Sequence, residues 1–368
     1  MKIAAIYTCW GLRKNKQYSG VGFYRIIQPF KHLKGYEIDV YGENINTLGK
    51  NREEVYHNLF STYDLIWTKH VDSPLDASAL GFCSQHYKKP LVIDLDDDYY
   101  NIRDDQPASE VYYSGSQKRA YVGAFLSLAS KITVSTQPLA WTYAKEMKKR
   151  HGKQFEIDIL PNFNDFDEFK YGQEYDNGDK VVIGWQGSTT HFADLKMVLP
   201  HIDRLMDKYP NVYLELLGGV EMERAGALFK GIKNIERISV NGGTQSWEGY
   251  PKLLSEQKWD IGICPLVDDK FNRGKSHIKW LEYSAYKIPT VASNVYPYYK
   301  DILGVKTIQD GSTGFLCEEF DWYEKLEKLV LDKDLRKQIA QNSYEYVRDH
   351  WQPNNWIDKW KNTIDNLI

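Results

Sequence analysis

Short apolar runs alternate with stretches of helical periodicity along almost the whole chain. In the first half, residues 117–129 and 138–150 have the pattern of helices, whereas residues 43–60 are too weakly patterned to assign. Strands that alternate with helices are typical of βαβ units, in which the strands are parallel. The predicted strands are Lys2–Thr8, Glu37–Tyr41, Asp64–Lys69, Pro90–Asp94, Lys131–Ser135 and Glu156–Leu160.

The same alternation starts again after residue 180. The polar segment Tyr171–Lys180 reads as a linker, and Asp321–Ile368 has the pattern of helices only. Two such series predict two Rossmann-like α/β domains. Helices are expected at 191–207, 246–257 and 275–287, and strands at Val181–Trp185, Val212–Leu217, Ile235–Val240, Asp260–Cys264 and Thr290–Ser293.

Composition places the 368 residues among ordinary globular proteins. The net charge is only −3, from 47 basic and 50 acidic side chains, whereas a dedicated nucleic-acid-binding protein usually carries a strong basic excess. No apolar run approaches the ~20 residues of a membrane helix, and the N-terminus reads as a strand rather than a signal peptide. Cys9, Cys83, Cys264 and Cys317 form no CxxC pair, which disfavours a disulfide framework or a zinc site. We therefore expect a cytoplasmic protein.

The segment Gly184–His191 lies between a predicted strand and a predicted helix. Its small residues, Gly187 and Ser188, would let backbone N–H groups approach an anion, and a helix N-terminus favours negative charge. The expected guest is a diphosphate. An ordinary tight turn in which Thr190 caps the helix fits the same residues.

The segment Asn272–Glu282 places charges along one edge of a predicted helix. At about 100° per residue, Lys275, Lys279 and Glu282 fall within ~40° of one line. The cations would bind phosphates, and the carboxylate would accept hydrogen bonds from two ribose hydroxyls. A solvated helix face with charges three and four residues apart is the alternative reading.

Four aspartates, Asp94 and Asp96–Asp98, stand at the end of the predicted strand Pro90–Asp94. Open α/β sheets bind ligands beyond the carboxyl ends of their strands, and crowded carboxylates should have raised pKa values. A metal site needs more ligands than this segment offers, so we expect no metal there. We predict that Asp96 or Asp97 faces the Lys275 end of the helix 275–287 and that these three residues are catalytic. A solvated acidic loop is the alternative.

The segment Ser19–Arg25 precedes the first predicted helix. Gly20 and Gly22 would keep the backbone close to a ligand in a cleft between the domains, with Arg25 beside it. A flexible connection between strand and helix fits equally well. The lone histidines have no metal spacing and are read as structural, except His191, which we also place in the cleft, and His277.

Together these motifs resemble the glycosyltransferases of the GT-B fold, in particular the large retaining family 4 and its relatives. The resemblance covers most of the chain, and its second half is the more specific because every motif falls at the expected place in order. It rests on Gly20–Arg25, Leu160–Asn164, Ile183–Ser188, Asp260–Pro265, Lys275–Glu282, Ile288–Ser293 and Asp310–Leu316.

The resemblance implies an acceptor domain at 1–170, a donor domain at 171–350 and a final helix at 351–368 that crosses back to the first domain. It also implies that a nucleotide-diphosphate sugar is the donor substrate and that Glu282 holds the ribose hydroxyls. No cofactor is required if lysine and arginine neutralise the departing diphosphate. The implied donor-binding residues are Gly187, Ser188, Arg273, Lys275, Ser276, Lys279 and Glu282.

Three positions depart from the family pattern. The glutamate expected eight residues before Glu282 is Gly274, and the basic residue expected in the turn after the first strand of the donor domain is Gln186. Asp94–Asp98 stand where many relatives carry a histidine. We expect Arg273 and Lys275 to supply the missing positive charge and the reaction to be retaining, in a divergent branch.

Two other classes of function stay open: a non-catalytic protein of this fold that binds nucleotide sugars or glycans, and a nucleotide-sugar epimerase. The acceptor hydroxyl is equally open, with a role in polysaccharide biosynthesis as the default. A glycan, a lipid-linked sugar, a protein side chain and a hydroxylated DNA base are the candidates, the last because of the basic segment Lys145–Arg150. The sequence does not predict an oligomeric state.

Overall fold

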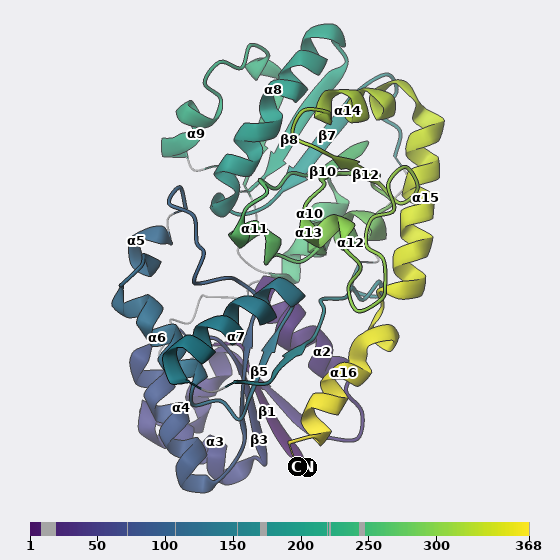
Figure 1. Cartoon of the computed structure of the whole chain (residues 1–368). Coiled ribbons are helices and arrows are strands. Elements are labelled where there is room, and N and C mark those ends of the chain that lie inside the picture. The colour runs from purple at the N-terminus through teal and green to yellow at the C-terminus, as the bar shows by residue number, and fades with distance from the viewer. Residues whose placement is uncertain are drawn as a thin grey trace.

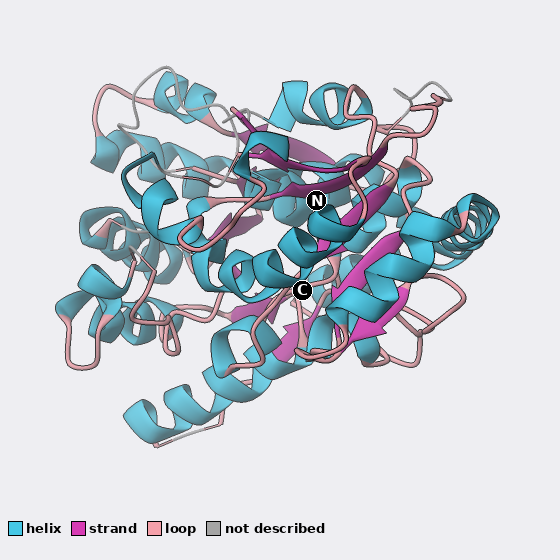
Figure 2. Ribbon diagram, turned by 90° about the horizontal axis from the view of Figure 1, so that it is seen from above, coloured by secondary structure: helices cyan, strands magenta, loops and turns pink. Residues whose placement is uncertain are grey.

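Two six-stranded parallel sheets, one in each half of the chain, form the framework of the molecule. The computed structural model describes residues 1–8, 20–71, 73–106, 108–152, 154–169, 175–218, 220, 222–242 and 247–367. Cys9, Ser19 and residues 171–174 of the predicted linker lie outside the described residues. Helices lie on both sides of the strands (Figure 1 and Figure 2). This doubly covered arrangement explains why most of the strands are nearly continuous apolar runs.

The first sheet has the order β2-β1-β3-β4-β5-β6. Its strands are β1 (Lys2–Ile6), β2 (Glu37–Tyr41), β3 (Leu65–Lys69), β4 (Leu91–Leu95), β5 (Lys131–Val134) and β6 (Ile157–Ile159). Its helices are α1 (Gly20–Gly22), the π-helical turn η1 (Phe23–Ile27), α2 (Gln28–His32), the 3-10 helix η2 (Glu43–Leu48), α3 (Arg52–Thr62), α4 (Pro74–Tyr87), α5 (Ser109–Tyr112), α6 (Gln117–Leu126) and α7 (Gln137–His151).

The second sheet has the order β12-β11-β10-β7-β8-β9. Its strands are β7 (Val181–Gln186), β8 (Val212–Leu217), β9 (Ile238–Asn241), β10 (Ile261–Cys264), β11 (Thr290–Ser293) and β12 (Phe315–Cys317). The helices among them are η3 (Thr189–His191), α8 (Phe192–Lys208), α9 (Met222–Leu228), η4 (Ile235–Arg237), η5 (Trp247–Gly249), α10 (Tyr250–Ser255), α11 (Lys270–Arg273), α12 (Ile278–Ala285) and α13 (Tyr296–Tyr299).

Three helices, α14 (Trp322–Leu331), α15 (Lys333–His350) and α16 (Pro353–Asp365), complete the chain. Whereas α15 packs on α12 of the second domain, α16 packs on α2 of the first (Figure 1). Thr363 Oγ1 donates to Asp158 Oδ2 at 2.7 Å, and the rings of Trp360 and Phe163 meet at 5.3 Å between centroids. The predicted architecture, two Rossmann-like domains with a last helix that crosses back, is confirmed. Among the described residues, no helix is both long and apolar enough to span a membrane.

The structure differs from the local predictions at two places and assigns one stretch that the sequence left open. The segment expected before the first helix is itself helical from Gly20 onward, and the unassigned stretch 43–60 contains η2 and most of α3, which Asn51 caps by accepting from the N–H of Glu54. The helix expected at 275–287 begins only at Ile278, because Gly274 ends the short helix α11. Lys275 therefore lies in a loop and not on the helix.

A buried guanidinium joins the first helical segment to the rest of the fold. Arg25 in η1 is fully buried, and its Nε and Nη2 donate to the two oxygens of Asp94 in β4 at 2.8 and 2.7 Å. Nη1 donates to the carbonyl of Leu160 and, at 2.9 Å, to Asn162 Oδ1, while the indole of Trp360 lies 5.6 Å away. Arg25 therefore has a structural environment and does not reach into an open cleft.

Arg25→Ala should lower the free energy of unfolding by about 3–5 kcal/mol, because it leaves the Asp94 carboxylate buried without its counter-ion. Arg273→Ala is the matched control, since Arg273 also makes a two-bond ion pair, with Asp268, but both side chains are about half exposed. An exposed pair contributes only about 0–1 kcal/mol. Urea denaturation of the three proteins measures both effects, and equal midpoints for the two variants would contradict the structural role of Arg25.

Candidate functional site

The carboxyl ends of the two sheets meet at the interface between the domains. Lys275 Nζ, in the loop after α11, lies 3.7 Å from Asp97 Oδ1, which follows β4. Two hydrogen bonds join the same loops: Thr136 Oγ1 donates to the carbonyl of Gly274 at 2.8 Å, and Asn162 Nδ2 donates to Ser276 Oγ at 2.9 Å. Of the two aspartates expected to face the Lys275 end of the helix 275–287, Asp97 is the one that lies near Lys275, although Lys275 itself is in a loop. The hydroxyl of Ser276, predicted to bind the donor, is engaged by the first domain.

The turn after β7 depends on a glycine and leads into a helix. A Cβ on Gly187 would lie 2.5 Å from the Trp185 ring, so only glycine fits at this position. The N–H of Gly187 donates to the Leu217 carbonyl at 3.2 Å, and Ser188 Oγ lies 2.8 Å from Thr190 Oγ1. Immediately afterwards η3 leads into α8, and the first N–H groups of a helix have no acceptor inside it. Gly187 therefore contributes space, and the donors for an anion come from the residues that follow it.

A chain of three side chains holds one of the predicted lysines beside this turn. Burial lowers the pKa of His191 to about 3, so the ring is neutral at neutral pH. Its Nδ1 lies 2.7 Å from Asp194 Oδ2, and its Nε2 lies 3.1 Å from Lys279 Nζ. Since ammonium can only donate, Nε2 accepts from Lys279 and Nδ1–H donates to Asp194. Burial and the nearby charge of Lys275 lower the pKa of Lys279.

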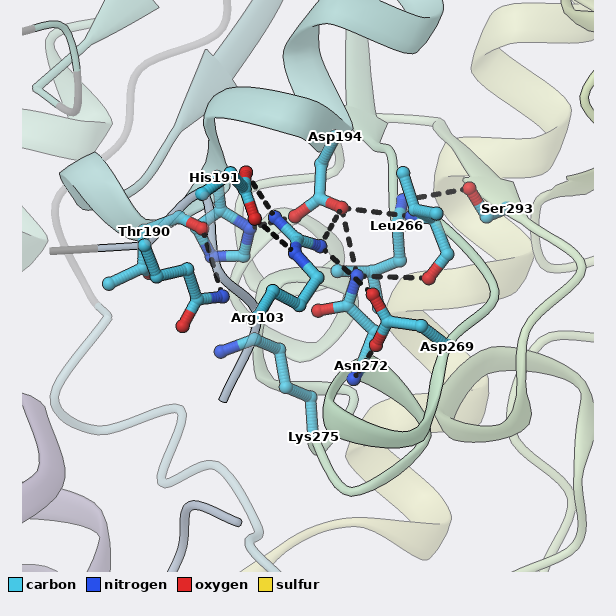
Figure 3. A network of polar contacts seen from close by, with 12 residues as sticks. Arg103, Thr190, His191, Asp194, Leu266, Asp269, Asn272, Lys275 and Ser293 are labelled. Carbon is cyan, nitrogen blue, oxygen red and sulfur yellow. Dashed lines mark hydrogen bonds and ion pairs between the residues drawn. The ribbon is translucent and has the colours of Figure 1, made fainter. Parts of the chain in front are cut away.

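An arginine from the first domain reaches the same carboxylate. Arg103 Nη1 lies 3.1 Å from Asp194 Oδ1 and 3.3 Å from Asp269 Oδ2, and Arg103 also pairs with its neighbour Asp105 (Figure 3). Asp194 is completely buried and also accepts from Asn272 Nδ2 at 2.8 Å. Neither Arg103 nor Asp194 was predicted from the sequence. Asp194 lies three residues after His191 on the helix, a spacing that could have pointed to it, whereas no local pattern marks Arg103.

Three other predicted residues do not lie free at this site. Arg273 is exposed and paired with Asp268 at 2.7 Å, so it does not supply the expected charge beside Lys275. Gly22 is buried, and Gly20 starts α1 at the surface beside Trp247, with a Cβ on it lying 3.9 Å from that ring.

Glu282 is buried rather than displayed on a polar helix edge. Its Oε1 accepts from the hydroxyl of Tyr24 at 2.9 Å, and its Oε2 accepts from Tyr250 and from Gln186 Nε2, both at 2.8 Å. Burial raises its pKa to about 7, although the two tyrosine hydrogen bonds act in the opposite direction. Tyr24 belongs to the first domain, so this carboxylate also joins the two domains.

Aromatic rings close around this glutamate. Phe23 and Trp247 stack at 4.0 Å between centroids with their planes 15° apart, and Tyr24 meets Trp247 edge-on at 5.0 Å. In this arrangement both oxygens of Glu282 already accept hydrogen bonds from protein groups.

The four aspartates at the end of β4 divide into two pairs. Asp94 is held by Arg25, and Asp98 accepts from Thr142 Oγ1 at 3.1 Å and from the N–H of Tyr100 at 3.0 Å. Burial and then the charge of Asp97 raise the pKa of Asp96 to about 7. Asp96 and Asp97 are thus the two that can take part in chemistry. Among the described residues, no group of three or more His, Cys, Asp or Glu side chains is arranged to hold a metal ion.

Glu282→Gln should remove part of the pH dependence of stability. The folded protein keeps a proton on Glu282 up to a pKa of about 7, whereas the ordinary value is 4.5. Between these values the folded state binds the extra proton, so the free energy of unfolding falls as pH rises, by up to about 1.4 kcal/mol per unit. Denaturation curves at several pH values should therefore show a shallower decline for the variant. Parallel curves would mean that Glu282 is ionised throughout this range in the folded state.

Comparison with known proteins gives matches in structure only. No protein-family model and no curated protein sequence matches the chain. TarM of S. aureus superposes with a TM-score of 0.60 at 13% identity over 85% of this chain and 58% of TarM. The chain therefore spans well under two thirds of the length of TarM.

Two further structures match over the full length. HepE of Anabaena, solved in complex with UDP-glucose, gives a TM-score of 0.62 at 14% identity over 100% of both chains. A glycosyltransferase from Rickettsia africae gives 0.65 at 15% identity over 100% of this chain and 98% of its own. The two-domain GT-B fold of these proteins is the fold of this chain.

Proposed function

We propose that the protein is a glycosyltransferase, which moves a sugar from a nucleotide-diphosphate sugar to an acceptor hydroxyl. The observation that carries the proposal is the meeting of Lys275 with Asp97 across the domain interface, at 3.7 Å. Cations suited to a diphosphate and carboxylates suited to a reacting hydroxyl thus face one another at the carboxyl ends of both sheets, where α/β folds bind ligands.

The donor diphosphate is proposed to lie at the turn Gly187–His191. There the start of the helical segment η3–α8 provides N–H donors, and Lys275 and Lys279 provide positive charge. As the bond between the sugar and the diphosphate breaks, these ammonium groups stabilise the negative charge on the departing group. The complex of HepE with UDP-glucose makes a uridine nucleotide the first donor to test.

Glu282 is proposed to accept the ribose hydroxyls. Tyr24, Tyr250 and Gln186 now donate to it, so a bound ribose replaces some of these bonds. Because Tyr24 belongs to the first domain, its release from Glu282 accompanies donor entry.

Asp96 and Asp97 are proposed to act on the acceptor side. A carboxylate whose pKa lies near the working pH is suited to take a proton from the attacking hydroxyl, and Asp96 fits this requirement. Asp97 places a negative charge near the positive charge that develops on the sugar. With the family resemblance, we propose that the transfer retains the anomeric configuration.

UDP and UDP-glucose should raise the melting temperature, by the stabilisation expected for a ligand that binds only the folded state, about 2.7 kcal/mol at a hundredfold excess over Kd. Lys275→Ala should weaken the shift for both ligands because it removes a phosphate-binding cation. Arg273→Ala is the control, since that side chain points to solvent and pairs with Asp268. If no nucleotide or nucleotide sugar shifts the melting temperature of the wild type, the donor site is wrongly placed.

Asp96→Asn and Asp97→Asn should each lower kcat while leaving donor affinity nearly intact, with the loss of acid–base help on the order of 10²–10⁴-fold. Activity of the wild type should rise with pH through the Asp96 pKa of about 7, because a base must be deprotonated, and this limb should vanish in Asp96→Asn. Asp104→Asn, at an exposed acid in the same loop region, is the control. Full activity in both variants would reject the assignment, and saturable donor binding without transfer or hydrolysis in the wild type would indicate a binding protein.

A further inference from the structure

Three aromatic rings form an exposed surface that spans the two domains. Trp141 in α7 has 59% of its surface exposed, and Tyr299 at the end of α13 has 46% exposed. Tyr296 lies between them: its ring centroid is 6.2 Å from that of Trp141 and 6.2 Å from that of Tyr299. We refer to Trp141, Tyr296 and Tyr299 as the aromatic platform. Single exposed aromatic residues are common, whereas these three rings lie next to one another and come from both domains.

In each domain, the aromatic platform follows a strand that is next to the strand leading to a proposed catalytic residue. Its first-domain member follows β5, the neighbour of β4, which leads to Asp96 and Asp97. Its second-domain members follow β11, the neighbour of β10, which leads to the loop of Lys275. Strands β4 and β5 are parallel, and so are β10 and β11. In each domain, the two segments therefore leave the sheet at its carboxyl edge.

Direct contacts confirm that α7 and the Lys275 loop are adjacent. Thr136, the residue before α7, donates to the carbonyl of Gly274 at 2.8 Å. A Cβ on Gly274 would lie 3.0 Å from Leu139 Cδ2, two residues before Trp141. On the other side, α13 packs against α11, which ends at Arg273. The two helices that carry the aromatic platform therefore lie beside the Lys275 loop and beside α11, which precedes that loop.

The chemistry of this surface suits a carbohydrate. Flat aromatic rings pack against the C–H faces of pyranose rings, and tyrosine adds a hydroxyl to a largely apolar face. The neighbouring Arg273–Asp268 pair offers exposed donors and acceptors for sugar hydroxyls. Because this arginine is already neutralised by its partner, it is poorly suited to a nucleic-acid or lipid phosphate.

We infer that the aromatic platform binds a sugar ring of the acceptor, outside the position that receives the transfer, so that the acceptor is an extended glycan chain. This inference rests on the proposed function for its role in catalysis, but binding of a glycan at this surface does not require that function.

Binding is tested first, without reference to activity. Short chito-, cello- and malto-oligosaccharides are titrated against the wild type, Trp141→Ala, Tyr299→Ala and Phe82→Ala, with calorimetry as the readout. Phe82 is the matched control, because it is 60% exposed and stacks on the ring of His86 on α4, outside the loops that join the two domains. We expect at least one oligosaccharide to bind the wild type and the control equally, and about tenfold more weakly, ~1.4 kcal/mol, to either platform variant. Equal affinity in all four proteins, or no binding by the wild type, overturns the inference.

Two further probes address the other ligand classes. Single-stranded DNA and phosphatidylglycerol vesicles are titrated in the same way, because Lys145 is exposed one turn beyond Trp141. Binding of either probe that depends on Trp141, in place of oligosaccharide binding, also overturns the inference.

Kinetics then separates this inference from the proposed function. In a transfer assay, Trp141→Ala should raise KM for the oligosaccharide about tenfold while leaving KM for the nucleotide sugar, donor hydrolysis and transfer to a simple monosaccharide glycoside unchanged. Oligosaccharide binding that depends on Trp141 in a protein without transfer or hydrolysis would reject the proposed function and keep the glycan surface. Sugar transfer by Trp141→Ala with an unchanged KM for the oligosaccharide would keep the proposed function and reject the glycan surface.

Discussion

The buried guanidinium of Arg25 is the interaction on which the arrangement of the site depends. It binds Asp94 in β4, the carbonyl of Leu160 after β6 and the side chain of Asn162, and it lies beside Trp360 in the last helix. Because a buried charge must keep its partners, these segments are held in one geometry. Asp96 follows Asp94 by two residues. Asn162 also donates a hydrogen bond to Ser276, the residue after Lys275. The two loops proposed to carry out the reaction are therefore both positioned from one cation.

Pairing decides which charges are left for chemistry. The arginines bind carboxylates through more than one hydrogen bond each: Arg25, Arg103 and Arg273. Three aspartates likewise accept several hydrogen bonds from protein groups: Asp94, Asp98 and Asp194. Lysine has a compact charge that a planar carboxylate cannot hold bidentately. Lys275 Nζ lies 3.7 Å from Asp97 Oδ1, and Lys279 Nζ donates to the neutral ring of His191 at 3.1 Å. The arginines thus set the framework, while Lys275 and Lys279 are the cations proposed to bind the diphosphate.

Most of the strands could be predicted from the sequence because they are short runs rich in apolar residues, and the order of motifs indicated the two-domain architecture. The three-residue strand β12 was not predicted. The start of α12 could not be predicted. The segment before it contains Gly274, whose carbonyl accepts a hydrogen bond from Thr136, far away in the sequence. Arg103 and Asp194 are 91 positions apart, so no local pattern links them. The burial of Arg25 and Asp94 did leave a signal: each is a lone charge inside an apolar run, FYRII and LVIDL. Two such residues of opposite charge in one domain predict a buried ion pair.

The contacts of Arg103 bear on how this protein could be recombined. Exchanging halves between related two-domain proteins is an attractive way to combine the properties of each. Here a first domain that lacked Arg103 would leave Asp194 without its cation from across the interface, and Asp194 orients His191 and, through it, Lys279. A hybrid would need to carry residue 103 together with residues 194 and 269 as one inherited set, although they belong to different halves of the chain.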